Sequence, residues 1–75
     1  MSITELAECL EGLKVPDGYY CLNCERHESL CIVVEDSQWK VFLSERGVRY
    51  EETTFATESE ACNYFLKRIR QLWQP

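Results

Sequence analysis

Three cysteines and one histidine lie close together in the first half of this 75-residue chain, in the segment YCLNCERHESLC, residues 20–31. Cys21, Cys24, His27 and Cys31 are of the types that bind zinc tetrahedrally. Neither glycine nor proline helps the chain turn between the first two cysteines, and no second ligand pair follows at the spacing of a zinc finger. A plain strand would point Cys21 and Cys24 to opposite faces. We therefore expect no metal ion.

A redox function is the second chemistry open to this segment. A reactive C-x-x-C pair normally lies at the start of a helix, where the dipole lowers a thiol pKa, whereas residues 19–24 are predicted to form a strand. We expect a hairpin in which cysteines fill space as small apolar side chains. The odd total of five argues against a closed disulfide framework. We expect free thiols in a reducing, cytoplasmic setting, with the exposure of Cys24 left open.

Enzymatic chemistry finds little support in the remaining residues. His27 is the single histidine and lies in a polar turn between Arg26 and Glu28. Glu51 and Glu52 are adjacent, so on a strand they point apart and do not form an acid–base pair. The sequence contains no glycine-rich phosphate loop, no HExxH and no serine elbow. We expect no enzyme activity, no catalytic residue and no cofactor.

The charge of the chain bears on the kind of partner it binds. The net charge is -5, from 13 acidic and eight basic side chains. All 13 acidic residues lie within residues 1–66. The charged residues of 67–75 are all basic, namely Lys67, Arg68 and Arg70. An acidic protein repels nucleic acid and anionic membranes and attracts basic proteins. The N-terminal segment lacks a signal-peptide pattern and no long apolar run predicts a membrane span.

The predicted elements alternate clearly along the chain. Two segments have a capping box followed by an apolar stripe at helical spacing, and they predict helices over residues 3–11, ended by Gly12, and 57–73. Alternating or β-branched segments between them predict strands over residues 19–24, 29–35, 38–44 and 48–54, with tight turns at 35–37 and at Arg46-Gly47.

These elements predict one α+β domain over residues 1–75. The intervals between strands are too short for crossover helices, so we expect a four-stranded antiparallel meander. Both helices should pack on one face of the sheet, the face of Trp39, Val41 and Leu43. The opposite face is then part apolar and part charged, and it is the first candidate for a partner surface. Its expected residues include Lys40, Phe42, Arg49 and Glu51.

Two segments resemble a known family. WKVFLSERG, residues 39–47, and FATESEACNYFL, residues 55–66, resemble the outline W-x-V-x-x-x-E-R-G and F-x-x-E-x-E-A-C-x-x-F-L of small immunity proteins from bacterial polymorphic-toxin and contact-dependent inhibition systems. The preceding GYYCLNCER, residues 18–26, fits the same outline, so the resemblance covers about residues 18–70. The cysteines near residue 21 are outside it.

The resemblance implies a protein that binds and blocks a cognate toxin domain, often a nuclease with a basic cleft. An acidic partner is steered toward such a cleft. The alternative is a small protein-interaction module or a homodimeric subunit, with the outer sheet face buried between copies. For partner binding we select acidic, basic and aromatic residues of the turns and outer strands, with Phe42 and Tyr50 as aromatic anchors. The set is Glu35, Asp36, Phe42, Glu45, Arg46, Arg49, Tyr50, Glu51 and Glu52.

Overall fold

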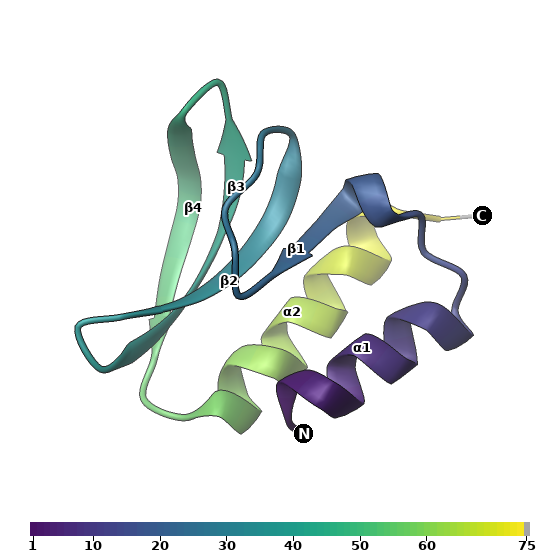
Figure 1. Cartoon of the computed structure of the whole chain (residues 1–75), viewed down its shortest axis with the longest axis horizontal. Helices are drawn as coiled ribbons and strands as arrows, with labels where there is room; N and C mark the ends of the chain where they lie inside the picture. The colour runs from purple at the N-terminus through teal and green to yellow at the C-terminus, as the bar shows by residue number, and fades with distance from the viewer. Residues whose placement is uncertain (75) are drawn as a thin grey trace.

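A computed structural model describes residues 1–74 of the chain as one sheet with two helices on the same side of it (Figure 1). The elements are α1 (Ile3–Gly12), the 3-10 turn η1 (Asp17–Tyr19), β1 (Tyr20–Leu22), β2 (Ser29–Glu35), β3 (Gln38–Glu45), β4 (Val48–Phe55) and α2 (Glu58–Leu72). The predicted α+β class, the two helices and the four strands are confirmed, each within a few residues of its expected bounds.

Local capping explains where both helices begin. The Ser2 hydroxyl accepts a hydrogen bond from the Glu5 amide, and the Glu5 carboxylate accepts one from the Ser2 amide, which completes the expected capping box. At α2, the Thr57 hydroxyl accepts from the Glu60 amide and also donates to the Glu60 carboxylate. Helix α1 ends at Gly12 as expected, with Leu13 as its C-cap, and the left-handed residue beyond this end is Lys14, with φ 61°.

The sheet has the strand order β1-β2-β3-β4 of the predicted meander, but its first pair is parallel. β2–β3 and β3–β4 are antiparallel, as expected. The prediction failed at β1 because this strand is only three residues long. A chain must travel back only about 7 Å to restart beside so short a strand, and residues 23–28 span that distance without a helix. Left-handed residues at both ends of this loop, Asn23 and Glu28, make the two reversals.

Two-residue turns set the register of the long strands. Asp36 and Ser37 connect the paired residues Glu35 and Gln38, and both have positive φ, 54° and 63°. Arg46 and Gly47 connect β3 to β4 in the same way, with φ 52° and 79°, so the expected positive φ at Gly47 is confirmed. Turns with two positive φ values match the right-handed twist of a hairpin.

The main core lies between the helices and one face of the sheet. α2 packs against β2, β3 and β4, and α1 lies alongside α2 on the same side (Figure 1). Trp39, Val41 and Leu43 all contribute to this core, so the predicted inner face is confirmed. The residues buried here are Leu6, Leu10, Val15, Leu30, Ile32, Val41, Ala61, Cys62, Phe65 and Ile69.

Candidate protein-binding site on the outer sheet face

A second, smaller apolar cluster lies on the sheet face that points away from the helices, which we call the outer face. Cys21 pairs with Cys31, and Cys31 pairs with Phe42, so the three side chains form one row across β1, β2 and β3. All three are buried, and Val33 packs beside them. Phe42 lies on the expected face, but it is 0% exposed and therefore supports the surface without being available as an anchor for a partner.

Arg49 covers this cluster. Its pairing with Ser44 places it on the outer face, and its guanidinium carbon lies 4.1 Å from the centroid of the Phe42 ring. Such a stacked cation is attracted to the negative face of the ring. Cys31 is covered from another side by the loop 23–28, because its thiol donates to the carbonyl of Arg26, 3.6 Å away. The expected exposed apolar part of this face is thus sealed by a loop and a charged side chain.

Three carboxylates from separate parts of the chain converge on the Arg49 guanidinium. Arg49 donates to both oxygens of Glu35, at 2.8 and 2.7 Å, and to both oxygens of Glu25, at 3.4 and 2.9 Å. It also donates to Glu52, at 2.9 Å. The Lys40 ammonium lies 3.5 Å from Glu35. We refer to Arg49, Lys40 and the three glutamates as the Arg49 cluster. Each carboxylate has a cationic neighbour, but the two cations and three carboxylates together have a formal charge of -1, so the surface stays acidic.

These contacts fix the charges of the cluster. Hydrogen bonds from Arg49, assisted by Lys40, lower the pKa of Glu35 from 4.5 to about 2. The hydrogen bonds that Arg49 donates to Glu35, Glu25 and Glu52 raise the pKa of Arg49 further above its ordinary value. Glu35 is therefore ionised throughout the physiological range. A carboxyl group with so low a pKa is a poor proton donor near neutral pH, so the cluster suits electrostatic recognition better than acid–base catalysis.

A β-bulge decides which residues of β4 join the cluster. Val41 pairs with Thr53 and Leu43 pairs with Tyr50, so Glu51 and Glu52 together face the single residue Phe42. Glu51 has left-handed backbone, with φ 53°. The extra residue shifts the alternation of side chains along the strand.

Two expectations about β4 are wrong: the bulge explains the one for Glu51, whereas Tyr50 precedes the bulge and lies on the inner face because it alternates with Arg49. Glu51, expected on the outer face, binds Arg68 of α2 across 2.6 Å. Tyr50 pairs with Leu43 of the inner face and is 47% exposed there, so it does not belong to the outer surface with Phe42.

The remaining selected residues lie at the two turns. Asp36 is exposed at the tip of the β2–β3 turn, next to the cluster residue Glu35. Glu45 and Arg46 are exposed at the β3–β4 turn, the other end of β3. The structure thus brings together Glu35, Arg49 and Glu52 from the predicted set, with Phe42 beneath them. Sequence reasoning missed Glu25, because its position depends on the parallel connection that was not foreseen.

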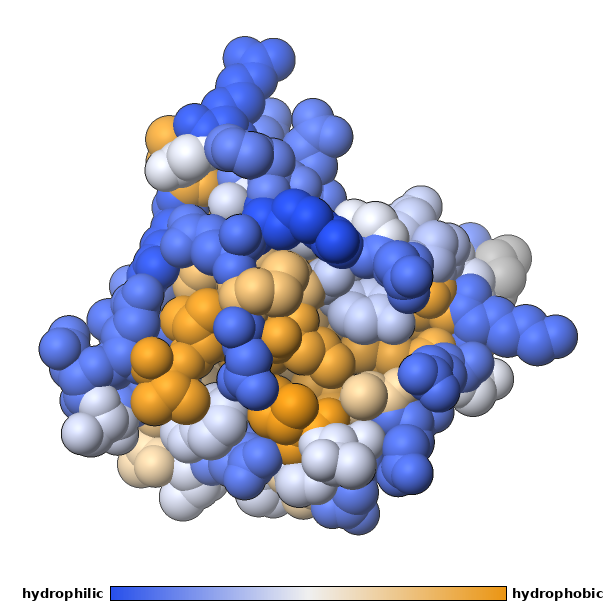
Figure 2. Space-filling model, viewed as in Figure 1, coloured by the Kyte–Doolittle hydropathy of each residue, from blue (hydrophilic) through white to orange (hydrophobic). Residues whose placement is uncertain are grey.

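A hollow with apolar lining lies on the inner side, near the tip of the β3–β4 hairpin. Its two adjoining parts share Glu28, Ser29 and Leu43 and extend to Tyr50 on one side and to Tyr19 and Leu72 on the other. Figure 2 shows, in the same view as Figure 1, that apolar side chains also gather at the centre of one face, with hydrophilic side chains around them.

The cysteine-rich segment differs from its prediction. Cys21 and Cys24 form a disulfide, with 5.4 Å between their Cα atoms, so the expectation of free thiols is wrong for these two. β1 ends at Leu22 and the left-handed Asn23 turns the chain, which brings the two cysteines together where a continuous strand would separate them. Cys9, Cys31 and Cys62 are free, and burial raises the pKa of the Cys31 and Cys62 thiols.

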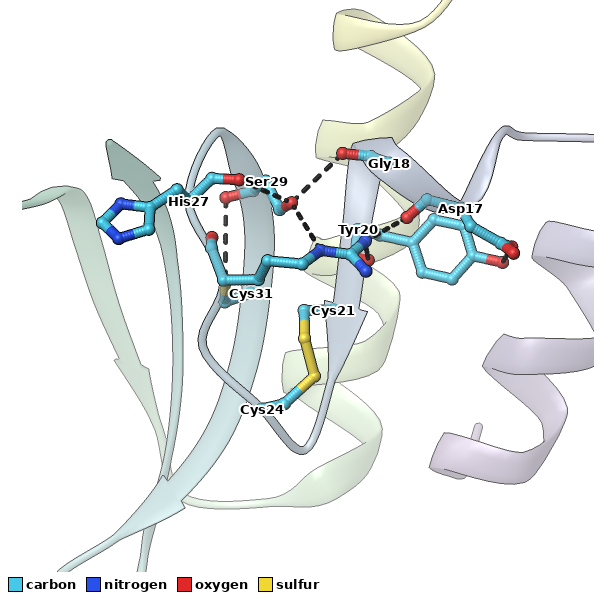
Figure 3. Close-up of a disulfide and its surroundings, with 9 residues drawn as sticks. Asp17, Gly18, Tyr20, Cys21, Cys24, His27, Ser29 and Cys31 are labelled. Carbon is cyan, nitrogen blue, oxygen red and sulfur yellow. Dashed lines mark hydrogen bonds between the residues drawn. A yellow bond between two sulfur atoms is a disulfide. The ribbon is translucent and has the colours of Figure 1, made fainter. Parts of the chain in front are cut away.

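His27 is turned away from the disulfide (Figure 3). Its Nδ1 atom accepts a hydrogen bond from the Gly47 amide, 3.2 Å away, so it ties the loop to the β3–β4 turn. Within residues 1–74, no group of three or more His, Cys, Asp or Glu side chains has an arrangement that would hold a metal ion. In the same range, neither helix is both long and apolar enough to cross a membrane.

No protein-family model, no curated protein and no solved structure matches this chain. The resemblance to immunity proteins therefore stays a prediction that rests on the two quoted segments.

Proposed function

We propose that this protein is a toxin-neutralising immunity protein that binds a basic toxin domain, such as a nuclease, through the Arg49 cluster of its outer sheet face. The observation that carries the proposal is the convergence of Glu25, Glu35 and Glu52 around one guanidinium, on the side of the sheet opposite both helices. The resemblance of residues 39–47 and 55–66 to the immunity-protein outline supports the same class of function.

The geometry favours binding of a basic surface because the carboxylates are already positioned. Arg49 holds them in place, so a partner does not have to order three flexible side chains when it binds. Only one oxygen of Glu52 accepts a hydrogen bond from Arg49, and its second oxygen is available to a lysine or arginine from outside. Surface charges of this kind chiefly raise the association rate and set orientation, and their effect decreases with salt.

Co-expression tests this proposal in cells. A toxin domain encoded beside the gene for this protein is expressed with the wild-type chain or with the double variant Glu35→Gln, Glu52→Gln. We expect the wild-type chain to restore growth and the double variant to lose most of that protection. A matched control is Glu8→Gln, Glu11→Gln, which removes the same charge from exposed positions on α1 and should protect as the wild type does.

Two outcomes would contradict the proposal. Cells that die as fast with the wild-type chain as without it would exclude neutralisation of that toxin. Protection that survives the outer-face variant but is lost with Tyr50→Ser, in the inner hollow, would place the contact on the other side of the sheet. That second result would keep the neutralising function but reject the Arg49 cluster as its contact surface.

A further inference from the structure

The two sulfurs of the Cys21–Cys24 disulfide belong to residues of very different accessibility. Cys21 is only 7% exposed and packs with Cys31 and Phe42, whereas Cys24 is an exposed residue in the loop after β1 (Figure 3). A thiolate opens a disulfide by attacking one sulfur, and access decides which sulfur it reaches. Here an incoming thiolate meets Cys24, and Cys21 is the leaving group.

The loop that contains Cys24 has other attachments that do not depend on the disulfide. The Arg26 guanidinium donates to the carbonyls of Asp17 and Tyr20, the latter at 2.7 Å, and to the Ser29 hydroxyl. His27 accepts from Gly47, as described above. The disulfide closes a loop with a sequence separation of only three, and short loops gain little chain entropy from a cross-link. Its opening should therefore leave the fold intact.

A third thiol, that of Cys31, lies next to the disulfide but is buried and hydrogen-bonded. Cys31 pairs with Cys21 across the parallel strands and is 0% exposed. Its Sγ atom donates to the carbonyls of Arg26 and Ser29, at 3.6 and 3.7 Å. Burial raises the pKa of this thiol, so it stays protonated and is a poor nucleophile. Cys31 is therefore a poor attacking group for the neighbouring disulfide, and the thiols that open this bond come from solution.

We propose that Cys24 is a site of reversible thiol–disulfide exchange, at which a low-molecular-weight thiol or a dithiol reductant opens the Cys21–Cys24 bond. The external thiolate bonds to Cys24 Sγ, the bond to Cys21 Sγ breaks, and Cys21 takes the electron pair and then a proton from water. A second external thiolate attacks the outer sulfur of the mixed disulfide and releases the Cys24 thiolate. Two external thiols are oxidised to one disulfide while the protein disulfide is reduced to two thiols.

Opening the bond changes the loop that supplies Glu25 to the Arg49 cluster. Glu25 directly follows Cys24, and its contacts with Arg49 join the loop to β4. Release of Cys24 should loosen residues 23–25 while Arg26 and His27 still anchor the far end. The redox state would then adjust the acidic surface, a consequence for partner binding that rests on the function proposed above. The exchange reaction itself does not depend on that function.

Glutathione is a suitable probe for this site. The full-length chain with Cys9→Ser, which removes the one free cysteine that is not buried, is incubated under native conditions in buffers of increasing reduced-to-oxidised glutathione ratio. Acid quenching, alkylation and peptide mass mapping then locate each modification. We expect the glutathione adduct on Cys24 to exceed that on Cys21 by about tenfold or more, because reaction at a thiol or disulfide follows access. Cys31 and Cys62 should stay unmodified.

A matched pair of variants separates the two sulfurs. In Cys21→Ser, Cys24 is left without its partner and should retain the glutathione adduct. In Cys24→Ser, the buried Cys21 should react with glutathione at about one tenth of the rate of Cys24 in the first variant, or more slowly still. If Cys21→Ser does not fold, Cys24→Ser carries the test, because it changes an exposed position. An adduct mainly on Cys21 or Cys31, or a bond that stays closed through the whole glutathione series, would overturn the proposal. No partner protein enters this experiment, so its outcome is independent of the immunity function.

Discussion

Replacing Arg49 with methionine should release Glu35 from its low pKa. Methionine keeps part of the apolar stem that covers Phe42 but removes every hydrogen bond that Arg49 donates to Glu35. Those hydrogen bonds are the largest cause of the shift from 4.5 to about 2. The Lys40 ammonium remains 3.5 Å from the carboxylate, so we expect the pKa of Glu35 to rise most of the way toward 4.5.

The same substitution should change how stability depends on pH. In the wild-type chain, the pKa of Glu35 is lower in the folded than in the unfolded state. Its contribution to stability is therefore fully present above pH 4.5 and is lost as the pH falls from 4.5 toward about 2. In Arg49→Met this part of the acid sensitivity should shrink, and Arg49→Lys, which keeps the charge but not the forked geometry, should give an intermediate pKa.

The assay is an NMR titration of the Glu35 side-chain carboxyl carbon in the three proteins, accompanied by urea unfolding at pH 6, 4 and 3. A Glu35 midpoint near 4.5 in the wild-type protein would refute the reasoning, because the Arg49 cluster would then not exist in solution. A midpoint that stays near 2 in Arg49→Met would refute it in another way, by assigning the shift to a group other than Arg49.

Three further predictions concern the stability of the sheet. Gly47→Ala should lower the free energy of unfolding by about 1 to 2 kcal/mol in urea denaturation, because Gly47 has a φ of 79° and a β-carbon there meets no other atom, so the loss is purely conformational. Ser37→Gly should raise it by about 0.5 to 1 kcal/mol, since Ser37 adopts a left-handed conformation that glycine takes without strain; a loss of stability would contradict this. Phe42→Leu should lower the free energy of unfolding by about 1 to 3 kcal/mol, whereas the control Val34→Ala, at a side chain that is 51% exposed, should change it by less than about 0.5 kcal/mol. Equal effects of the last two would show that the outer-face cluster is not packed.

The sequence predicted the elements well where local signals agree. Helix α2 has an N-cap, acidic residues in its first turn, a basic residue in its last turn and an apolar stripe, and its bounds are close to those expected. The alternation of Trp39, Val41 and Leu43 identified the inner face, because β3 lies in the middle of the sheet and has no irregularity of its own.

The errors have two physical sources. The first is the length of β1, which at three residues is too short for the usual requirement of a long crossover in parallel pairs. That error concealed both the disulfide at Cys24 and the contribution of Glu25. The second is the bulge at Glu51, which shifts the side-chain alternation by one residue, removes Glu51 from the outer face and places Glu52 there. Tyr50 was selected although alternation with Arg49 already places it on the inner face. The left-handed position is occupied by Glu51 and not by glycine or asparagine, so the sequence pattern does not predict the bulge.

The affinity of the purified chain for a basic toxin domain of the proposed class tests the central claim most directly. Titration calorimetry at low and at high salt compares the wild-type chain with Glu35→Gln, Glu52→Gln and with the charge-matched Glu8→Gln, Glu11→Gln. We expect binding that weakens with salt and that weakens at least tenfold, about 1.4 kcal/mol, in the outer-face variant alone. Equal affinities of the two variants, or binding that is independent of salt, would contradict the claim that the Arg49 cluster is the contact surface.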